Sequence, residues 1–450
     1  MISSIGASSR FGDLAYTASN ARDMGRFGEN ADTKTMSRII AANSGFALIV
    51  TTAVCFISCP LTYFLSETAL SDTIGPRDLL ILYIGTAINA ALGSLSVVWL
   101  ATFDGLLISE KRTLISATSI TLNITCVALF ISSLGLYAVL IGQTVQFASA
   151  LCYAFVLLRR SHKISFALPK LNLAHLRFAG PLQGTSILQQ GFEYVTKIAL
   201  LRIGGAEIVG LFEVALRGSQ SLRQLIAGSL QVLLPHSARR IAEEPQNLSA
   251  QWLLVRTSTL VASLGSALAC LALIFAIPLI ADFFQVSSSG SFAFLMTACA
   301  IGWIGSLGIA PAFYCILGWG TSKPALYSST IMLIVISIAA LSISAPNWPT
   351  FISIYTIAIW LASSPVIMSL KQLGVGTKDI LAMLRLIIMG LVALSSGLFA
   401  RRLFPGLVNG GIIFSASFIV MVLMAYFHAP SELKALAESF GFPGRFNRKK

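Results

Sequence analysis

The sequence predicts an all-α membrane protein in which about twelve helices cross the bilayer. Hydrophobic residues make up 56% of the 450-residue chain and charged residues only 11%, whereas about 25% of the residues of a soluble domain are charged. The mean hydropathy of the chain is +0.81. So few charges cannot cover a water-facing surface for a chain of this length, and most of the surface is therefore expected to face lipid.

Twelve apolar segments are long enough to form membrane-spanning helices, each of which needs about 20 residues. We number them from one to twelve along the chain. They lie at residues 39–65, 79–103, 114–134, 136–158, 178–201, 209–234, 255–281, 292–317, 325–343, 351–370, 380–400 and 411–427.

The basic residues predict the orientation of these segments. Of the 31 Lys and Arg residues, 24 lie in tails and connections on one side, and only Arg77, Arg202, Arg401 and Arg402 fall on the other. By the positive-inside rule, we expect both termini in the cytoplasm. The net charge of +13 is then typical of a membrane protein, and no nucleic-acid partner is expected.

Motifs of catalysis and metal binding are absent from the sequence. It contains no GxSxG elbow, no phosphate-binding P-loop and no HExxH zinc motif. All seven cysteines lie inside apolar segments without a CxxC pair, and the four histidines lie at or just beyond segment ends. The longest loop on the side opposite the termini, roughly residues 66–78, is too short for a catalytic domain. We therefore expect no enzyme, no catalytic residue, no metal site and no cofactor.

An internal repeat with an offset of 212 residues predicts two lobes around a central cavity, a common plan for transporters. At this offset residues 109–114 align with residues 321–326, and segments one to four fall on segments seven to ten. The expected domains are a polar cytoplasmic segment (1–38), a four-helix N-lobe (39–158), a basic cytoplasmic linker (159–177), a six-helix C-lobe (178–370), two additional helices (371–427) and a basic cytoplasmic tail (428–450).

The N-lobe has no counterpart for the fifth and sixth segments. Residues 1–38 align with residues 213–250, so that Arg10 falls near Arg223. The simplest interpretation is that this chain begins inside what would be its second helix, and that the N-lobe lacks its first helical hairpin. The alternative interpretation is a polar tail in solution or at the membrane surface.

Charged and amide side chains inside the apolar segments are concentrated in the fifth and sixth segments. A charge at the centre of a membrane helix costs about 2.5–3.5 kcal/mol on insertion scales and usually marks a pathway or a cavity. The polar side chains that share a helical face, or lie beside it, are Ser186, Gln189, Gln190, Glu193 and Lys197 in the fifth segment and Glu213, Arg217, Gln220, Arg223 and Gln224 in the sixth.

Two interpretations of this hairpin remain open. Glu193 with Lys197, and Glu213 with Arg217, are spaced for a purely structural ion-pair seam. A water-filled cavity also accounts for the amides and for Arg223, and guanidinium groups bind phosphate in a bidentate manner. The second interpretation indicates an anionic, phosphate-containing cargo. Its candidate binding residues are Arg217, Arg223, Lys197, Glu193, Glu213, Gln190, Gln220 and Gln224.

Around this hairpin the chain resembles the polysaccharide-synthesis branch of the multidrug/oligosaccharidyl-lipid/polysaccharide exporter superfamily. The similar stretches are LRFAGPL at 176–182, GGAEIVGLF at 204–212, LLP at 233–235 and RFGEN at 26–30. In the first of these, Ala179 interrupts the L-R-F-G-x-P pattern of the branch.

The resemblance implies a two-lobed flippase that works by alternating access. Members of the branch move undecaprenyl-pyrophosphate-linked oligosaccharides across the bacterial inner membrane for exopolysaccharide, O-antigen (lipopolysaccharide) or capsule biosynthesis. The implied partners are the lipid-linked oligosaccharide, membrane lipids and other membrane proteins of polysaccharide assembly. Twelve-helix and fourteen-helix forms exist, and this chain is similar to the longer form without its first pair.

Three alternatives remain. A drug or cation antiporter of the same superfamily would be expected to carry acidic cavity residues, whereas this hairpin carries three bases against two acids. A membrane-embedded polysaccharide polymerase or ligase would need catalytic groups on a long outer loop. A non-transporting scaffold is the third, if the first hairpin is absent from the protein.

Overall fold

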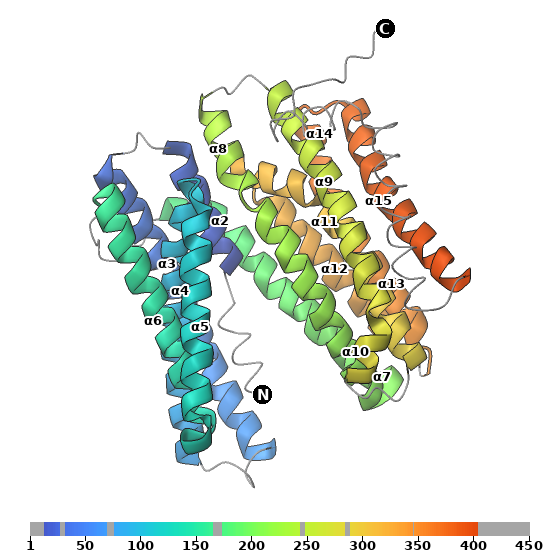
Figure 1. Cartoon of the computed structure of the whole chain (residues 1–450), viewed down its shortest axis with the longest axis horizontal. Coiled ribbons are helices and arrows are strands. Elements are labelled where there is room, and N and C mark those ends of the chain that lie inside the picture. Colours follow the sequence, from blue (N-terminus) through green and yellow to red (C-terminus); the bar gives the residue numbers. More distant parts are fainter. Residues whose placement is uncertain are drawn as a thin grey trace. The chain divides into compact units, whose positions relative to one another are not determined.

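A computed structural model describes residues 13–27, 32–69, 76–164, 173–243, 248–283, 289–344 and 346–403. In these ranges all regular secondary structure is helical (Figure 1). The helices are α2 (Asp13–Phe27), α3 (Thr33–Ala69), α4 (Pro76–Gly105), α5 (Ser109–Leu134), α6 (Leu136–His162), α7 (Leu173–Leu230), α8 (Leu233–Glu243), α9 (Leu248–Phe275), α10 (Ile277–Phe283), α11 (Ser289–Gly318), α12 (Lys323–Ser342), α13 (Trp348–Leu361), α14 (Ser364–Gln372) and α15 (Thr377–Leu403).

These helices follow the expected membrane segments. Eleven of the twelve segments lie in them, and the twelfth, residues 411–427, lies outside the described residues. Within the described ranges, eight helical stretches are long and apolar enough to cross a membrane, namely Thr33–Phe56, Leu80–Gly105, Ser109–Leu134, Tyr137–His162, Trp252–Phe275, Gly290–Gly318, Lys323–Ser342 and Trp348–Gln372. The prediction of an all-α, multi-pass membrane protein is therefore confirmed.

The fifth and sixth segments form the two halves of α7, which reverses direction at Gly205. Gly205 has φ 80° and ψ 179°, a conformation that is essentially restricted to glycine. Arg217 Nη2 lies 3.9 Å from Glu193 Oε1 across this bend, although the two residues are 24 positions apart. A straight helix of that length would span about 36 Å. The bend at Gly205 therefore folds the two halves of α7 into a tight hairpin.

By their packing, the helices fall into two compact units. The first comprises Met1–Ile187, Leu234–Glu243 and Leu317–Ser322, and the second comprises Leu188–Leu233, Glu244–Ile316 and Lys323–Lys450. The first unit thus contains α2 to α6, the start of α7 and α8. The second contains the rest of α7, with Glu193, Lys197, Glu213, Arg217 and Arg223, together with most of the helices that follow α8.

In the first unit, the short helix α2 is buried by its neighbours. The ring of Tyr16 meets the ring of Phe46 in α3 edge to face, with centroids 5.8 Å apart. Asn20 donates from Nδ2 to the carbonyl of Val98 at 2.7 Å and to Thr102 Oγ1 at 2.9 Å, both in α4. This part of the expected polar segment is thus a packed helix.

Glycines allow helices of the first unit to approach one another closely. A Cβ on Gly25 of α2 would lie 2.7 Å from the carbonyl oxygen of Pro235 in α8. A Cβ on Gly105 of α4 would collide with the side chain of Met24 in α2. Small residues of this kind let membrane helices pack backbone to backbone. Gly25 and Gly105 thus allow α2 to lie directly against α8 and α4.

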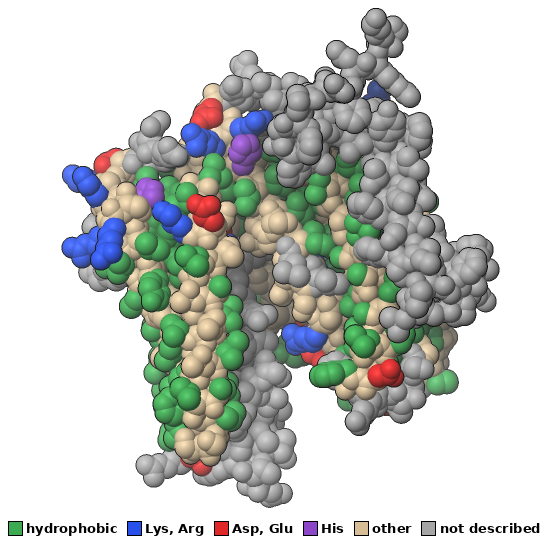
Figure 2. Space-filling view, viewed as in Figure 1, with side chains coloured by type: hydrophobic (Ala, Val, Ile, Leu, Met, Phe, Trp, Pro, Cys, Tyr) green, Lys and Arg blue, Asp and Glu red, His purple; other side chains and the backbone are tan. Residues whose placement is uncertain are grey.

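Apolar side chains cover the outer face of α5. Leu114, Ile124 and Leu129 are 68%, 63% and 67% exposed. Figure 2 shows hydrophobic side chains along α5 and α6, and Lys and Arg side chains gathered at one end of these helices. An apolar face of this size is suited to contact with lipid. The basic end is where the positive-inside rule expects the cytoplasmic connections of these helices.

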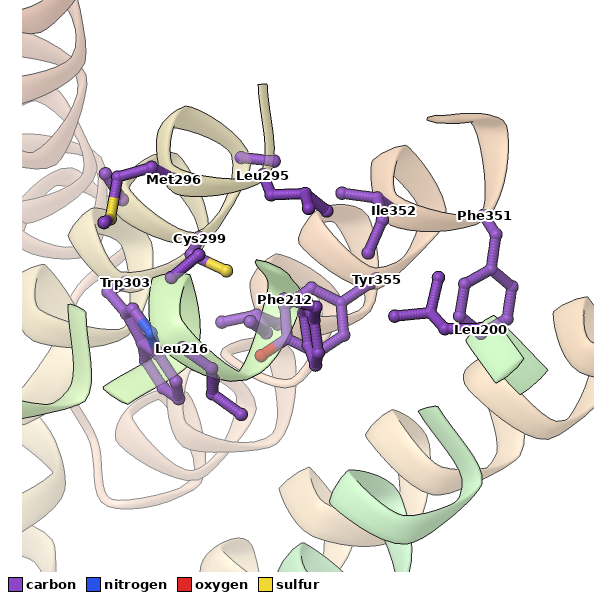
Figure 3. Packing of buried hydrophobic residues seen from close by; sticks show 14 of the residues in the cluster. Leu200, Phe212, Leu216, Leu295, Met296, Cys299, Trp303, Phe351, Ile352 and Tyr355 are labelled. Atoms are coloured by element: carbon purple, nitrogen blue, oxygen red, sulfur yellow. The ribbon is translucent and has the colours of Figure 1, made fainter. Parts of the chain in front are cut away.

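The core of the second unit joins α7 to α11 and α13. Phe212 of α7 is fully buried, and its ring lies edge-on to Tyr355 of α13 with centroids 5.5 Å apart. Phe192, from the other half of α7, stacks on Tyr355 with centroids 5.1 Å apart. Figure 3 shows Phe212 and Tyr355 side by side, near Cys299 and Trp303 of α11. These contacts anchor both halves of the polar hairpin.

Candidate functional site

Four of the predicted residues form a closed ring of salt bridges across the α7 hairpin. Lys197 Nζ lies 2.7 Å from Glu193 Oε1 and 2.7 Å from Glu213 Oε2. Arg217 Nε lies 2.9 Å from Glu213 Oε1, and its Nη2 lies 3.9 Å from Glu193 Oε1. We call Glu193, Lys197, Glu213 and Arg217 the charge ring. It contains two acids and two bases, and it therefore has no net charge.

The charge ring follows from helical spacing and from the bend at Gly205. Within each half of α7, an acid and a base four residues apart lie on one face of the helix. The bend then brings Lys197 of the first half against Glu213 of the second half. Sequence spacing predicted the pairs within each half, whereas the bridges between the halves depend on how the hairpin packs.

Arg217 is the most accessible member of the ring. Its side chain is 52% exposed, whereas that of Lys197 is 24% exposed. The two contacts of Arg217 use its Nε and Nη2 atoms. Because a guanidinium carries five N–H donors, Arg217 keeps donor capacity for a further anion.

Arg223 lies outside the charge ring and stacks on Trp303 of α11. Its Cζ atom is 4.4 Å from the centroid of the indole, a cation–π arrangement. Arg22 in the first unit stacks in the same way on Phe178, but it is paired with Asp23 at 2.6 Å. Within the described part of the chain, Arg223 makes no salt bridge. Its positive charge is therefore not offset by a described acid.

Arg223 lines a small pocket between α7, α9 and α11. Its walls include Ser266 and Cys270 of α9 and Ala300 and Trp303 of α11. The hydroxyl of Ser266 donates to a backbone carbonyl of its own helix at 3.0 Å. A cation in such weakly polar surroundings favours an anionic partner.

Sequence reasoning missed Tyr355, a buried tyrosine of α13 that contacts both halves of α7. Its ring is held between Phe192 and Phe212, one from each half of α7. Tyr355 lies in an apolar segment with no charged neighbour in sequence. No local signal in the sequence therefore distinguishes it from an ordinary core aromatic residue.

Two of the three predicted glutamines, Gln220 and Gln224, lie apart from the contacts of the charge ring. Gln190 and Gln220 are half-buried, and Gln224 is exposed. Within the described residues, the side chains of Gln220 and Gln224 make no hydrogen bond to the charge ring. The same residues contain no group of three His, Cys, Asp or Glu side chains placed to hold a metal ion. The structure thus clusters four of the eight predicted residues and places Arg223 in a second site.

A sequence profile of a family described as polysaccharide biosynthesis protein matches residues 11–241. The match covers just over half of the chain and includes the whole of the α7 hairpin. The chain belongs to this family. The resemblance inferred from the motifs around α7 is thereby confirmed. In a comparison with curated protein sequences, nothing matches this member of the polysaccharide biosynthesis family.

Solved structures share the fold of this polysaccharide biosynthesis protein. A MATE protein in complex with MaD5 has a TM-score of 0.65 at 14% identity, covering 85% of this chain and 87% of its own. An outward-facing multidrug resistance MATE family transporter of the MOP superfamily has a TM-score of 0.64 at 14% identity, with 84% and 85% covered. A MOP superfamily transporter from Pyrococcus furiosus also has a TM-score of 0.64, at 16% identity and with 84% and 85% covered. The chain therefore has the fold of this superfamily.

Proposed function

We propose that this member of the polysaccharide biosynthesis family is a flippase and not an enzyme. Its cargo is an undecaprenyl-pyrophosphate-linked oligosaccharide, moved across the bacterial inner membrane for exopolysaccharide, O-antigen or capsule biosynthesis. The family match and the fold shared with MOP superfamily transporters support this assignment. A site that opens alternately to the two sides of the membrane moves such a cargo without making or breaking a covalent bond.

The observation that carries the proposal is the guanidinium of Arg223, which stacks on Trp303 and has no salt bridge among the described residues. A charge placed in an apolar environment is costly unless it is paired. The pyrophosphate of the cargo supplies the missing negative charge and accepts bidentate hydrogen bonds from the guanidinium. Arg217, the exposed cation of the charge ring, is the second candidate contact.

A drug or cation antiporter is the main competing function. The Pyrococcus furiosus transporter is described as having a binding pocket of reverse polarity that suggests a different function. In this chain, the α7 hairpin places Lys197, Arg217 and Arg223 against two acids. The excess of positive charge favours an anionic cargo over a cationic drug.

Reconstitution tests the proposed flippase directly. The purified chain is placed in liposomes that contain a fluorescent undecaprenyl-pyrophosphate-linked oligosaccharide, and a membrane-impermeant enzyme reports how much cargo reaches the outer leaflet. We expect faster appearance of this cargo than in protein-free liposomes. The same oligosaccharide on a neutral lipid should move no faster than in the protein-free control. Transport of a cationic dye, without transport of the lipid-linked oligosaccharide, would favour the antiporter instead.

We further propose that both termini of this chain lie in the cytoplasm, on the basis of the 24 basic residues that fall on one side against four on the other. Reporter proteins fused after Lys450 test this orientation. A reporter that is active only in the cytoplasm should give signal. Activity restricted to a periplasmic reporter would contradict the proposal.

A further inference from the structure

The charge ring already holds an anion against Arg217. Glu213 Oε1 accepts a hydrogen bond from Arg217 Nε at 2.9 Å. A phosphate group that needs this edge of the guanidinium must displace that carboxylate oxygen. The exposed side chain of Arg217 makes the exchange possible without opening the helix packing.

Glu213 keeps a partner when Arg217 is taken from it. Its second oxygen, Oε2, lies 2.7 Å from Lys197 Nζ. Lys197 also contacts Glu193 at 2.7 Å, so the lysine remains in place between the two acids. The displaced carboxylate is therefore not left as an isolated charge in the membrane, which would be costly.

We propose that Glu213 is an internal competitor of the cargo, which limits how tightly the site holds a pyrophosphate and so speeds its release. This inference rests on the proposed function, because it requires an anionic cargo at Arg217 and Arg223. Arg223, with no acid paired to it among the described residues, supplies affinity. Arg217, with Glu213 as a competing partner, makes the binding reversible.

Carboxylate and phosphate compete on similar terms for a guanidinium, because both accept charge-assisted, bidentate hydrogen bonds. When the cargo binds at Arg217, one strong contact therefore replaces another. The gain in binding free energy is smaller than it would be at a guanidinium with no acidic partner. A site that moves its ligand must bind it strongly enough to capture it and weakly enough to release it. Removing the carboxylate of Glu213 should therefore raise the affinity for pyrophosphate and slow the turnover of the cargo.

Glu193 provides a matched control in the same ring. Its Oε1 lies 3.9 Å from Arg217 Nη2, beyond hydrogen-bonding distance, whereas Glu213 holds Arg217 directly at 2.9 Å. Glu193→Gln and Glu213→Gln remove the same charge from the same half-exposed environment. The two substitutions differ in whether Arg217 loses a direct charge-assisted hydrogen bond, which only Glu213 makes.

The experiment measures binding and dissociation of inorganic pyrophosphate by the full chain in lipid nanodiscs. Glu213→Gln should bind pyrophosphate about tenfold more tightly, with a correspondingly slower dissociation rate, as expected for one charge-assisted hydrogen bond. Glu193→Gln should change the affinity by about threefold at most, through its charge alone. Arg223→Ala should weaken binding. Turnover of the lipid-linked cargo by Glu213→Gln should fall below that of the wild type.

The outcomes separate this inference from the proposed function. If Arg223→Ala weakens binding while Glu213→Gln binds like the wild type or more weakly, the competitor role is wrong and the flippase assignment stands. If the wild type does not bind pyrophosphate and its arginine variants transport normally, both are wrong. Should Glu213→Gln fail to insert, Glu213→Asp keeps the charge but shortens the side chain. A folded Glu213→Asp variant should then show an intermediate gain in affinity, and unchanged affinity would overturn the competitor role.

Discussion

The guanidinium of Arg223 lies 4.4 Å from the centroid of the Trp303 ring, in the second unit of the protein. Stacking on the indole orients the flat guanidinium and leaves its N–H donors at the edges. No acid pairs with Arg223 in the described part of the chain. We propose that this pair is a preformed anion-binding element, and it leads to the first two predictions.

Arg223→Ala should abolish glycan export while leaving membrane insertion and abundance unchanged, because it breaks no salt bridge between described residues. Arg223→Lys should restore export only in part, since lysine keeps the charge but loses the bidentate fork. Surface polysaccharide and the amount of protein in the membrane are measured together. Normal export by Arg223→Ala would mean that the polar face of α7 is structural.

Trp303→Phe should lower pyrophosphate affinity by several fold, because phenylalanine offers a weaker face to the guanidinium and a cation–π contact is worth about 0.5–2 kcal/mol. Trp252→Phe in α9 is the matched control, since Trp252 is also buried but does not line the Arg223 pocket. Binding to the purified variants is compared at equal thermal stability. Equal losses of affinity in both variants would point to a general packing defect.

Lys197→Met should destabilise the α7 hairpin by about 1–2 kcal/mol, because it removes the cation that lies 2.7 Å from both Glu193 and Glu213 and leaves only Arg217 beside the two acids. Adding Glu213→Gln should cost less than the sum of the two single substitutions, since the remaining acid repulsion is removed. Unfolding of the purified variants in detergent measures both effects. Strict additivity would argue against a coupled charge ring.

Gly25→Ala should destabilise the first unit by about 1–3 kcal/mol, because the added Cβ would lie 2.7 Å from the carbonyl oxygen of Pro235. Gly228→Ala in α7 is the control, since no atom lies within 4 Å of its added Cβ. The control should be neutral or more stable by up to about 1 kcal/mol, from helix propensity alone. Melting curves in detergent compare the two. A stable Gly25→Ala variant would show that α2 and α8 separate readily.

The membrane helices could be predicted because each must satisfy its own backbone hydrogen bonds in lipid, which requires a long apolar run. The hairpin at Gly205 could also be predicted, since paired glycines mark a tight turn. Helix α2 could not be identified in this way. It carries polar residues such as Asn20 that are fully buried, and the burial of Asn20 depends on hydrogen-bond partners in α4 and α3.

For the candidate site, the sequence by itself determined which residues bring charge into the membrane and which of them pair along one helix, because helical periodicity sets those neighbours. Only the tertiary structure decided that Lys197 bridges to Glu213 across the bend, that Trp303 stacks on Arg223 and that Tyr355 packs between the two halves of α7. These contacts join residues far apart in the chain. They depend on how α7, α11 and α13 pack, and no local spacing encodes that packing.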